Sequence, residues 1–581
     1  MTRPFAPKHW RILKSDNDAA ANLQSQLGIH PAVSALLVQR GVNTPEAASA
    51  FLYPSLTGMH DPLLLPDAEI ACERLKQALA KHEKILIHGD YDGDGVTSAA
   101  LWARCLRALG ADADVFVPHR GRDGYDMRSP FIERAAAAGA GLIVTTDCGI
   151  QRVDEVEMAR SAGIDVIITD HHTPRASGEL PNALAVVNPH RKDSKYPFAD
   201  LAGVGVAFKL CEALTRHLGK SVDGFRRGFM DLAAIGTITD VMPLLDENRI
   251  LVKFGLEQLQ NTKKPGLRAL IYEAGYAEKQ IDAYGVGFGL GPRLNAASRV
   301  DETKIALDLL LTRDETEAGK LAKRLNELNL ERRTIQERIL QEAMTQALQH
   351  DLSETRCLVV SGCGWSGSIV GIVASKIVDR LNRPCVVIAI DEATGRGRGS
   401  ARSIQAFNMF EAIHQCSELL HEYGGHAHAA GLSISAERVG DFADQMNRIA
   451  CMQLTEENCV PTQDVALELP HDQISAELLD QMASLAPFGN GNPEPHFASR
   501  GVRIHEIKRM GADKQHLKLI LDAEGVNPTN LVDAPWWNRG DLADVLEPGM
   551  SMDLCYRPQF NHFNGRRTIQ FLLDDIRPAD W

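Results

Sequence analysis

The sequence predicts an α/β protein of several domains, and three observations indicate this class. The chain has 581 residues, more than one hydrophobic core usually serves, so about three or four domains are expected. From residue 84 to residue 190, a short apolar run, a polar turn and an alanine-rich helical stretch follow one another repeatedly. Beyond about residue 460 the pattern changes to short β runs with turn signals between them.

The first domain is predicted to contain a doubly wound parallel sheet. Five apolar runs alternate with helix-favouring segments, and strand, helix, strand at this spacing indicates parallel βαβ units. The expected strands are residues 84–90, 113–119, 141–149, 164–172 and 183–190. Ligands of such sheets bind beyond the carboxyl ends of the strands, so the polar residues that end these runs are expected to meet in one crevice.

Two helical segments are expected next. Residues 229–259 predict a helix, a turn and a second helix, with Asp240 and Pro243 at the break. Residues 319–338 predict one long amphipathic helix, because leucine and isoleucine recur at spacings of four and three. Its polar face is rich in lysine and arginine, Arg332 included. Two interpretations of that face remain, a solvated connector between domains or a basic strut beside a substrate groove.

A second α/β unit and a barrel are predicted for the rest of the chain. The second unit has a strand at residues 356–362, a helix at residues 371–384 and a strand at residues 385–392. The later β runs, with a hairpin signal at Asn564 and Gly565, indicate an antiparallel barrel. Small barrels of this kind often bind single strands of nucleic acid.

Composition limits the class of protein. The net charge of -14 at pH 7 argues against a nonspecific binder of nucleic acid, which usually carries a basic excess. A protein that gathers acids around metals and keeps basic residues along a separate groove remains compatible with it. The eleven cysteines form no CxxC pair, which favours reduced thiols. The sequence has no signal-peptide pattern and no run of about 18 apolar residues that could span a membrane, so a cytoplasmic protein is expected.

Carboxylates and histidines crowd the expected strand ends. Three aspartates occupy every second position after the first strand, and further acids and two histidines follow the third strand, the fourth strand and the helix break. Carboxylates that converge in this way repel one another unless cations neutralise them. The candidate residues are Asp90, Asp92, Asp94, Asp147, Asp170, His171, His172 and Asp240.

The residue types in this set indicate which cation it would hold. Carboxylate and imidazole ligands without a thiolate suit Mn²⁺ or Mg²⁺ better than structural zinc. An excess of acids over the needs of one ion indicates two ions with a bridging carboxylate, an arrangement that hydrolyses phosphate esters or phosphoanhydrides. An EF-hand calcium loop is disfavoured, because the twelfth position counted from Asp90, where that loop needs glutamate, is Leu101.

These residues lie in motifs that resemble the DHH phosphoesterase superfamily, and in particular its single-strand-specific 5′ to 3′ DNA exonucleases. The motifs that carry the candidate ligands are GDYDGDGVTS, TTDCGI, TDHH and GTITDVMPL. Other stretches that resemble the family are PHRGRDGY, LAGVGVAFKL, GLGPRLNAASR, GIVASKIVDRLNRP, GSARSI, GGHAHAAG and PFGNGNPEP. The likeness extends from about residue 60 to the C-terminus.

The resemblance implies roles for the acidic and histidine residues. The implied centre of two Mn²⁺ or Mg²⁺ ions consists of Asp90, Asp92, Asp94, Asp147, His171 and Asp240. Asp147 would bridge the two ions, and His172 would contact the scissile phosphate. His88 is an alternative to Asp90, because it also matches the first motif, HxxxDxD, of the superfamily's pyrophosphatases; a buried strand histidine is more often structural.

The resemblance also implies which residues hold the DNA strand. The segment GRGRGSARS (395–403) is interpreted either as a flexible basic loop or as a loop that captures the 5′-terminal phosphate. Tyr125 is equally well explained as a strand contact or as a core residue. The expected substrate-binding residues are Arg120, Tyr125, Arg293, Asn295, Arg299, Ser400, Arg402, Ser403, Gly424, Gly425 and His426.

Three positions depart from the family pattern, and none of them is an expected ligand. Ser366 stands where related sequences usually have histidine, Ser298 replaces the glycine of AAGR, and Ala401 replaces the second glycine of GSGRS. The change at Ser366 puts a role of that histidine in doubt here and leaves open an altered rate or substrate preference.

The implied function is the release of 5′-mononucleotides from single-stranded DNA in recombination and repair. A monomer that cooperates with a single-strand binding protein and helicases, away from membranes, is expected. The expected parts are an N-terminal extension (1–60), a DHH catalytic domain (61–300), a long connecting helix (301–350), a DHHA1 substrate-binding domain (351–458) and an OB-fold domain (459–581).

Two alternatives remain at this point. One is a hydrolase of small substrates such as short oligoribonucleotides, cyclic dinucleotides or pyrophosphate, which the long C-terminal region disfavours because a small substrate needs no such extension. The other is a binding module without catalysis, which the intact set of candidate ligands disfavours.

Overall fold

The computed structural model describes residues 8–124 and 126–579. The chain divides into two compact units. The larger unit contains Lys14–Asn329 and Ile474–Pro495. The smaller unit contains Leu330–Gln473 and His496–Trp581, together with the N-terminal residues before Lys14. Each unit is described below by itself.

The larger unit contains the parallel sheet that the sequence predicts. Its strands are β2 (Ile85–Gly89), β3 (Ala113–Phe116), β4 (Leu142–Thr146), β5 (Asp165–Thr169) and β6 (Ala185–Val187). All neighbours are parallel, in the order β3-β2-β4-β5-β6. The order reverses between β2 and β4, and a ligand crevice is expected outside the carboxyl ends of strands at such a reversal.

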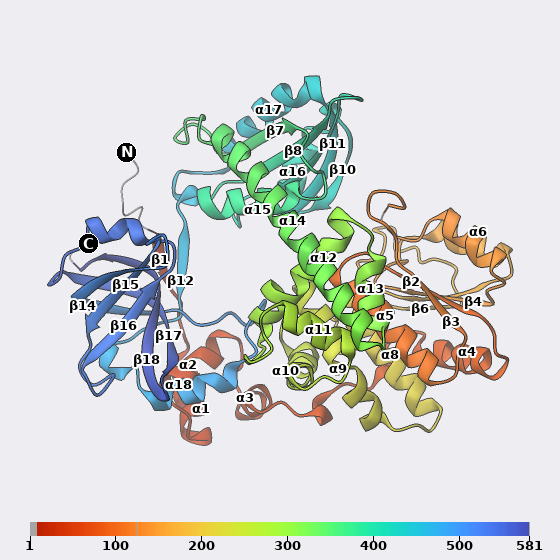
Figure 1. The fold of residues 1–581 in the computed structure, drawn as a ribbon, viewed down its shortest axis with the longest axis horizontal. Helices are drawn as coiled ribbons and strands as arrows, with labels where there is room; N and C mark the ends of the chain where they lie inside the picture. The colour runs from red at the N-terminus through yellow and green to blue at the C-terminus, as the bar shows by residue number, and fades with distance from the viewer. Residues whose placement is uncertain (1–7, 125, 580–581) are drawn as a thin grey trace. The chain divides into compact units, whose positions relative to one another are not determined.

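Helices cover both faces of this sheet (Figure 1). One face packs against α4 (Ala68–Ala80), α5 (Gly93–Ala108) and α8 (Gly203–His217), and the other against α6 (Ser129–Ala137) and α7 (Val153–Ser161). Alternate strand residues face the two layers, so Val144 joins the first core and Ile143 the second. Strands buried on both faces explain the continuous apolar runs of the sequence, and the doubly wound fold is confirmed.

Two helices meet at the expected break. Helix α9 (Val222–Thr239) is followed by Asp240 as its C-cap and by Val241 at φ 58°, and α10 (Asp246–Gln260) begins shortly afterwards. The left-handed turn at Val241 ends α9, so the Asp240 carboxylate lies at a helix end rather than inside a helix.

Further helices complete the larger unit. The N-terminal helices are α1 (Asn17–Leu27), α2 (Pro31–Gln39) and α3 (Pro45–Leu52). After α10 follow α11 (Pro265–Glu273), a π-helical turn (Gly285–Leu290), α12 (Gly291–Val300) and α13 (Lys304–Leu311). The buried Arg249 of α10 donates to carbonyls of α3 and of the segment 484–486, so α10 is fastened to distant parts of the chain.

The long helix is α14 (Glu315–Ala347), longer at both ends than the segment the sequence predicts. It begins in the larger unit and ends in the smaller one, since the division falls between Asn329 and Leu330. Arg332 is not part of a basic solvent-facing surface, because it is buried and donates to Gln336 Oε1 at 2.7 Å. That assignment from the sequence was wrong: the helix buries the aliphatic part of Arg332 and pairs its guanidinium locally.

The smaller unit contains a mixed sheet. Its strands are β7 (Leu358–Cys363), β8 (Cys385–Asp391), β9 (Arg396–Arg402), β10 (Leu420–His426) and β11 (Ala429–Ser435), in the order β10-β11-β9-β8-β7. Only β7 and β8 pair in parallel among these described strands. Helices α15 (Val370–Leu381), α16 (Met409–His414) and α17 (Val439–Gln453) accompany this second α/β unit.

The expectation of a loop at residues 395–403 was wrong, because this segment forms strand β9 between β8 and β11. The glycines are required by packing. A Cβ on Gly397 would lie 2.8 Å from Ile388 Cγ2, and a Cβ on Gly399 would lie 2.7 Å from Leu432 Cδ1. Buried glycine and alanine therefore alternate with arginine and Ser400 along a central strand.

A barrel ends the chain. Its strands are β14 (Phe497–Met510), β15 (His516–Asp522), β16 (Leu531–Trp536), β17 (Ser551–Phe563) and β18 (Arg566–Pro578). Strand β14 pairs with both β15 and β17, which closes the barrel, and the short β13 (Leu467–Glu468) joins β14. The Asn564-Gly565 turn has positive φ at both residues, as the hairpin signal predicts. The OB-fold prediction is confirmed.

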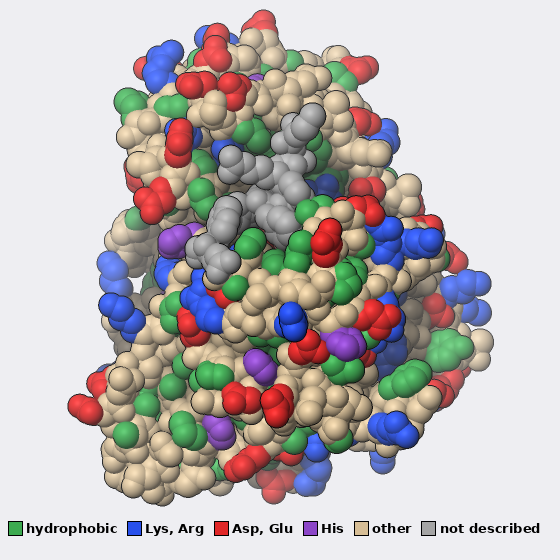
Figure 2. Space-filling view, turned by 90° about the vertical axis from the view of Figure 1, so that its left-hand side faces the viewer, with side chains coloured by type: hydrophobic (Ala, Val, Ile, Leu, Met, Phe, Trp, Pro, Cys, Tyr) green, Lys and Arg blue, Asp and Glu red, His purple; other side chains and the backbone are tan. Residues whose placement is uncertain are grey.

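The N-terminal strand β1 (His9–Ile12) pairs with β12 (Thr462–Val465) in the smaller unit. Trp10 Nε1 donates to Asp575 Oδ2 of β18 at 2.8 Å, which anchors this strand to the barrel. Among the helices of the described ranges, none is both long and apolar enough to cross a membrane. On the face seen in Figure 2, acidic and basic side chains are interspersed, so that face carries no single-sign field.

Candidate metal centre

The first aspartates sit where strand β2 passes into helix α5. Asp90 follows β2, Asp92 is the N-cap of α5, and Asp94 lies in its first turn. Asp92 Oδ1 accepts from the backbone N–H groups of Asp94 at 3.0 Å and Gly95 at 3.1 Å. The GDYDGDG motif is therefore a strand-to-helix turn capped by its own middle aspartate.

Asp94 is held between two helix N-termini. Its Oδ2 accepts from Gly203 N at 2.7 Å and its Oδ1 from Val204 N at 2.8 Å, both in the first turn of α8. A helix N-terminus stabilises negative charge, so α8 orients this carboxylate. The sequence interpretation missed these backbone donors; the Gly-x-Gly at the start of a helical stretch, Gly203 to Gly205, was the available signal.

Asp147 and the histidines come from the next two strand ends. Asp147 follows β4 with a left-handed φ of 60°. Such a backbone costs about 1–3 kcal/mol for a non-glycine residue and marks a functional constraint. Asp147 leaves no room for a side chain at position 203, since a Cβ on Gly203 would lie 2.6 Å from Asp147 Cβ. His171 and His172 follow β5 after Asp170.

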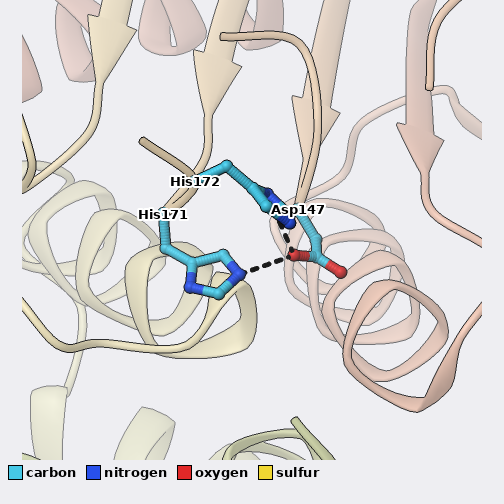
Figure 3. A group of neighbouring side chains, drawn as sticks. All are labelled: Asp147, His171 and His172. Carbon is cyan, nitrogen blue, oxygen red and sulfur yellow. Dashed lines mark ion pairs between the residues drawn. The ribbon is translucent and has the colours of Figure 1, made fainter. Parts of the chain in front are cut away.

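Both histidine rings point toward Asp147 (Figure 3). His171 Nε2 lies 3.1 Å from Asp147 Oδ1 and 3.6 Å from Asp240 Oδ2, while His172 Nδ1 lies 3.9 Å from Asp147 Oδ1. The ends of β4, β5 and α9 thus bring an imidazole and two carboxylates to one point. The crevice at the sheet reversal is the place where the sequence predicts this convergence.

Among the residues that the structure describes, three groups of side chains have ligand atoms within 4.8 Å of one another. They are Asp147 with His171 and His172, Asp94 with His171 and Asp240, and Asp90 with Asp92 and Asp147. Asp147 and His171 each belong to two groups, so the groups form one continuous cluster. A pair of ions that shares a ligand fits such a cluster, whereas a single ion would leave some of these atoms out of reach.

Unsatisfied atoms support this fit. Within the described residues, Asp90 Oδ1, Asp147 Oδ1 and His171 Nε2 are buried without a hydrogen-bond partner. A buried polar atom without a partner costs about 1–3 kcal/mol. All three are atoms that ligate Mn²⁺ or Mg²⁺, so the residues present fit divalent cations.

The acid–base properties of the carboxylates agree with cation binding. Burial, followed by the charges of neighbouring aspartates, raises the pKa of Asp94 to about 7 and that of Asp240 to about 9. The same causes raise the pKa values of Asp90 and Asp147 well above the ordinary range. Without cations the cluster holds protons near neutral pH; divalent cations replace them.

The two histidines have opposite acid–base properties. Burial lowers the pKa of His171 to about 4, so its ring is neutral at pH 7 and can act as a ligand. Burial also disfavours the charged form of His172. Its hydrogen bond to Asp170, 2.8 Å from Nδ1 to Oδ1, and the charges of Asp170, Asp240 and Asp90 together outweigh burial and raise its pKa to about 9. His172 is therefore a cation at neutral pH.

Asp170 orients the histidine pair and is not placed as a ligand. Its Oδ1 accepts from the N–H groups of His171 and His172, and its Oδ2 from Ile150 N at 2.9 Å. Burial by itself raises the pKa of Asp170, but the hydrogen bond and charge of His172 outweigh it and lower that pKa. Asp170 of the TDHH motif therefore holds the two histidines in place and is not assigned as a metal ligand.

The geometry favours Asp90 over His88 as a ligand. The buried His88 ring lies 4.6 Å from the Phe131 ring, and its Nδ1 lies 3.4 Å from Cys148 Sγ. Burial lowers its pKa to about 3. No ligand group among the described residues includes His88, whereas one includes Asp90.

Substrate candidates in the larger unit have different surroundings. The Arg120 guanidinium stacks on the Tyr91 ring at 4.1 Å, beside Asp90. Arg293 donates to Asn326 Oδ1 and to the carbonyls of Gly289 and Glu273, contacts that favour a structural role. Asn295 and Arg299 are half-buried on α12. Tyr125 lies outside the described residues.

Substrate candidates in the smaller unit gather near the N-terminus of α15. A Cβ on Gly371 would lie 2.9 Å from Ser400 Oγ and 3.3 Å from Arg402 Nη2. Arg402 also donates to Ser400 Oγ at 3.1 Å. A helix N-terminus beside an arginine and a hydroxyl is a suitable anion site. Ser366 Oγ lies 2.8 Å from Ser368 Oγ just before this helix.

The other candidates of the smaller unit lie at strand ends. Ser403 Oγ donates to Phe407 O at 2.7 Å, directly after β9. Gly424, Gly425 and His426 end β10. Gly425 needs to be glycine, because it has φ 143° and a Cβ there would lie 2.4 Å from Ala429 O.

Comparison with known proteins agrees with this fold. Three family models match: the DHH family, N-terminal domain, over residues 84–237, the DHHA1 domain over residues 354–450 and the RecJ OB domain over residues 465–575. A doubly wound sheet that ends in this cluster of aspartate and histidine defines a DHH phosphoesterase.

Similar proteins show to which family of DHH phosphoesterases the chain belongs. The chain is 40% identical to the single-stranded-DNA-specific exonuclease RecJ of Bacillus subtilis, over 98% of this chain and 71% of that protein. It is 34% identical to RecJ of Escherichia coli, over 98% of this chain and 99% of that protein. The crystal structure of Thermus thermophilus RecJ with Mn²⁺ matches with TM-score 0.83 and 32% identity, over 98% of this chain and 79% of that one. The chain belongs to the RecJ family.

Proposed function

We propose that this protein is a single-stranded-DNA-specific exonuclease that hydrolyses phosphodiester bonds from the 5′ end. It releases 5′-mononucleotides and acts in DNA recombination and repair. The observation that carries the proposal is the buried cluster in which Asp147 and His171 are shared between ligand groups. Its relatives, the RecJ proteins of B. subtilis and E. coli, are named single-stranded-DNA-specific exonucleases.

Two divalent cations, Mn²⁺ or Mg²⁺, fit the cluster. Crystal structures of T. thermophilus RecJ contain Mn²⁺ in one case and Mg²⁺ in another. The ligands assigned here are Asp90, Asp92, Asp94, Asp147, His171 and Asp240. When bound, such a pair lowers the pKa of an attacking water and stabilises the charge that develops on the phosphate.

The protein's own residues position this chemistry. The α8 N-terminus fixes Asp94, and the left-handed backbone at Asp147 turns that carboxylate toward both histidines. His172, protonated and held by Asp170, is assigned to contact the scissile phosphate. A cation in that place stabilises negative charge in the transition state.

Strand binding is assigned to residues of both units. Arg120, Asn295 and Arg299 belong to the larger unit, while Ser400, Arg402, Ser403, Gly424, Gly425 and His426 belong to the smaller one. In the smaller unit the anion site at the start of α15 is suited to a 5′-terminal phosphate. Arg293 is not assigned to the strand, because its hydrogen bonds to Asn326 and Gly289 hold α12 in place.

The proposal includes the setting of the enzyme. It is a cytoplasmic monomer that works with helicases and a single-strand binding protein, which open the duplex and present its substrate. The domain boundaries expected from the sequence, at residues 60, 300, 350 and 458, belong to the same proposal.

The test is a digestion with Mn²⁺ of single-stranded DNA labelled at either end, alongside duplex DNA, short RNA and pyrophosphate. We expect the 5′ label to appear as mononucleotide at once and the 3′ label to remain in long products. Asp147→Ala should lower the rate by about a hundredfold or more, because it removes the shared ligand. Asp154→Ala, an exposed acid of α7, is the matched control. Digestion from the 3′ end, or near-normal activity of Asp147→Ala, would overturn the proposal.

A further inference from the structure

Two of the solvent-exposed aromatic rings on the larger unit, those of Tyr284 and Phe288, are neighbours. Tyr284 is 67% exposed and Phe288 is 65% exposed. The two rings lie against each other with centroids 4.6 Å apart and an angle of 31° between their planes. Single exposed rings such as Tyr53 occur elsewhere on the chain, but two exposed rings packed against each other form an apolar patch, and such patches are typical of binding surfaces.

The helix that follows these rings packs against a helix that carries one of the candidate metal ligands. Phe288 lies in the π-helical turn that leads into α12. A Cβ on Gly291 would lie 2.5 Å from Thr239 Cγ2, and a Cβ on Gly93 would lie 2.8 Å from Thr239 Oγ1. Thr239 directly precedes Asp240, so this helix packs against the end of α9 that carries a ligand.

One face of the same helix connects the rings to expected strand contacts. Tyr284 and Phe288 are exposed and Asn295 and Arg299 are half-buried, with Asn295 Oδ1 itself enclosed, while Gly289, Leu290, Leu294, Ala296, Ala297 and Ser298 are buried. Steps of four, seven and four residues place the accessible side chains on one face. From Phe288 to Arg299 the face extends about 16 Å at the helical rise per residue. The face changes along its length from apolar rings to an amide and a guanidinium.

We propose that Tyr284 and Phe288 form a platform on which unpaired bases of the DNA strand stack. The proposal rests on the exonuclease function and adds a determinant of its specificity. Every base has an apolar face that stacks on an aromatic ring irrespective of sequence. In a duplex both faces of each internal base are already stacked, so the platform favours an unpaired strand. Asn295 and Arg299, further along the face, then lie where the polar backbone of that strand passes.

The charge beside the platform indicates bases and not phosphates at this end. Tyr284 borders a pocket of about 970 Å³. The charged residues that line it are Lys253, Glu257, Glu278, Lys279, Asp282 and Glu494. Acids outnumber lysines there, so this pocket does not attract the phosphate backbone, and stacking on the rings is the interaction that would hold the strand at this end. The rings therefore suit bases, and the basic end of the helix suits the backbone.

The test measures binding without hydrolysis. The full-length protein in EDTA is titrated with a thymidine oligonucleotide and with the same oligonucleotide carrying several abasic sites. We expect the wild type to bind the abasic strand about tenfold more weakly, equivalent to about 1.4 kcal/mol. Phe288→Ala should weaken binding of the intact strand by a similar factor and be nearly insensitive to the abasic sites. Phe288→Trp should restore the sensitivity.

Controls separate the platform from general damage and from the function itself. Tyr53→Ala removes an aromatic ring that is 68% exposed elsewhere on the larger unit, and it should leave both affinities unchanged. If the abasic sites lowered the affinity of wild type and of Phe288→Ala by the same factor, the platform would be overturned. The rings would then be assigned to contact with a protein partner. Hydrolysis with Mn²⁺ is scored separately: a wild type that shows the abasic effect in EDTA but digests no strand would refute the exonuclease and not the platform.

Discussion

Metal binding to this site should release protons. Burial and neighbouring aspartates raise the pKa of Asp240 to about 9 and that of Asp94 to about 7. At pH 7 the metal-free Asp240 carboxyl therefore holds about one proton and that of Asp94 about half of one. Cations need these groups ionised, so Mn²⁺ binding expels at least about 1.5 protons per chain. Because protons leave, the apparent affinity for Mn²⁺ rises with pH, about tenfold per pH unit for each proton released.

The proton count is measured by titration calorimetry at pH 7 in two buffers of different ionisation enthalpy. Asp240→Asn removes one titrating carboxyl and should lower the count by about one. Asp154→Asn, on the surface of α7, should leave it unchanged. A wild-type count below about half a proton, or an affinity that falls as pH rises from 5 to 7, would refute the assignment of these buried carboxyls as ligands.

Other consequences follow from individual contacts. Asp170→Asn removes the partner that raises the pKa of His172 to about 9, so the alkaline limb of the pH–rate profile should move to lower pH; an unshifted limb would contradict the role of this pair. Gly203→Ala places a Cβ 2.6 Å from Asp147 Cβ and should cost about 1–3 kcal/mol of unfolding free energy with weaker Mn²⁺ binding. Gly228→Ala, with open space around it in α9, should stabilise by about 0.5–1 kcal/mol, and equal effects of the two would argue against the packing described. Arg249→Met leaves four carbonyl acceptors without their donor and should lower the unfolding free energy by about 3 kcal/mol or more, read from denaturant titration; a neutral result would show that these bonds contribute little.

The sheet and its acidic edge could be predicted because each signal is local. Apolar runs ending in Asp90, Asp147 and Asp170 indicate strands, and parallel connection places their ends together. The helix break could likewise be predicted from Asp240 and Pro243. What brings Asp240 next to His171, at 3.6 Å, is the packing of α9 on α5 and α8, which no local pattern contains.

The two expectations from the sequence that were wrong, for residues 395–403 and for Arg332, have a common physical cause. In residues 395–403, glycine was taken as flexibility, but Gly397 and Gly399 are glycines because side chains of neighbouring strands leave no room for a Cβ. Arg332 looked solvent-facing by charge, yet its stem is buried on α14. Charge and glycine content are properties of the sequence alone. The conformation of residues 395–403 and the burial of Arg332 depend on the side chains that pack against them.

Ligand choice also depends on three-dimensional contacts. His88 and Asp90 fit family motifs equally well, and only the packing of His88 against Phe131 and Cys148 separates them. Asp170 has the same residue type as Asp147, but its oxygens accept backbone N–H groups, whereas Asp147 Oδ1 has no hydrogen-bond partner in the described chain. Hydrogen-bond satisfaction separates Asp170 from Asp147, but it is no general rule for the site, because both oxygens of the assigned ligand Asp94 also accept backbone N–H groups.

The central claim is that Asp147 is shared by two divalent ions. The most direct test is electron paramagnetic resonance of the protein loaded with Mn²⁺, with the bound metal counted per chain. The account predicts about two ions per chain with the spectrum of an exchange-coupled pair, and loss of that coupling in Asp147→Asn. A spectrum of isolated ions in the wild type, or an exchange-coupled pair that survives Asp147→Asn, would contradict it.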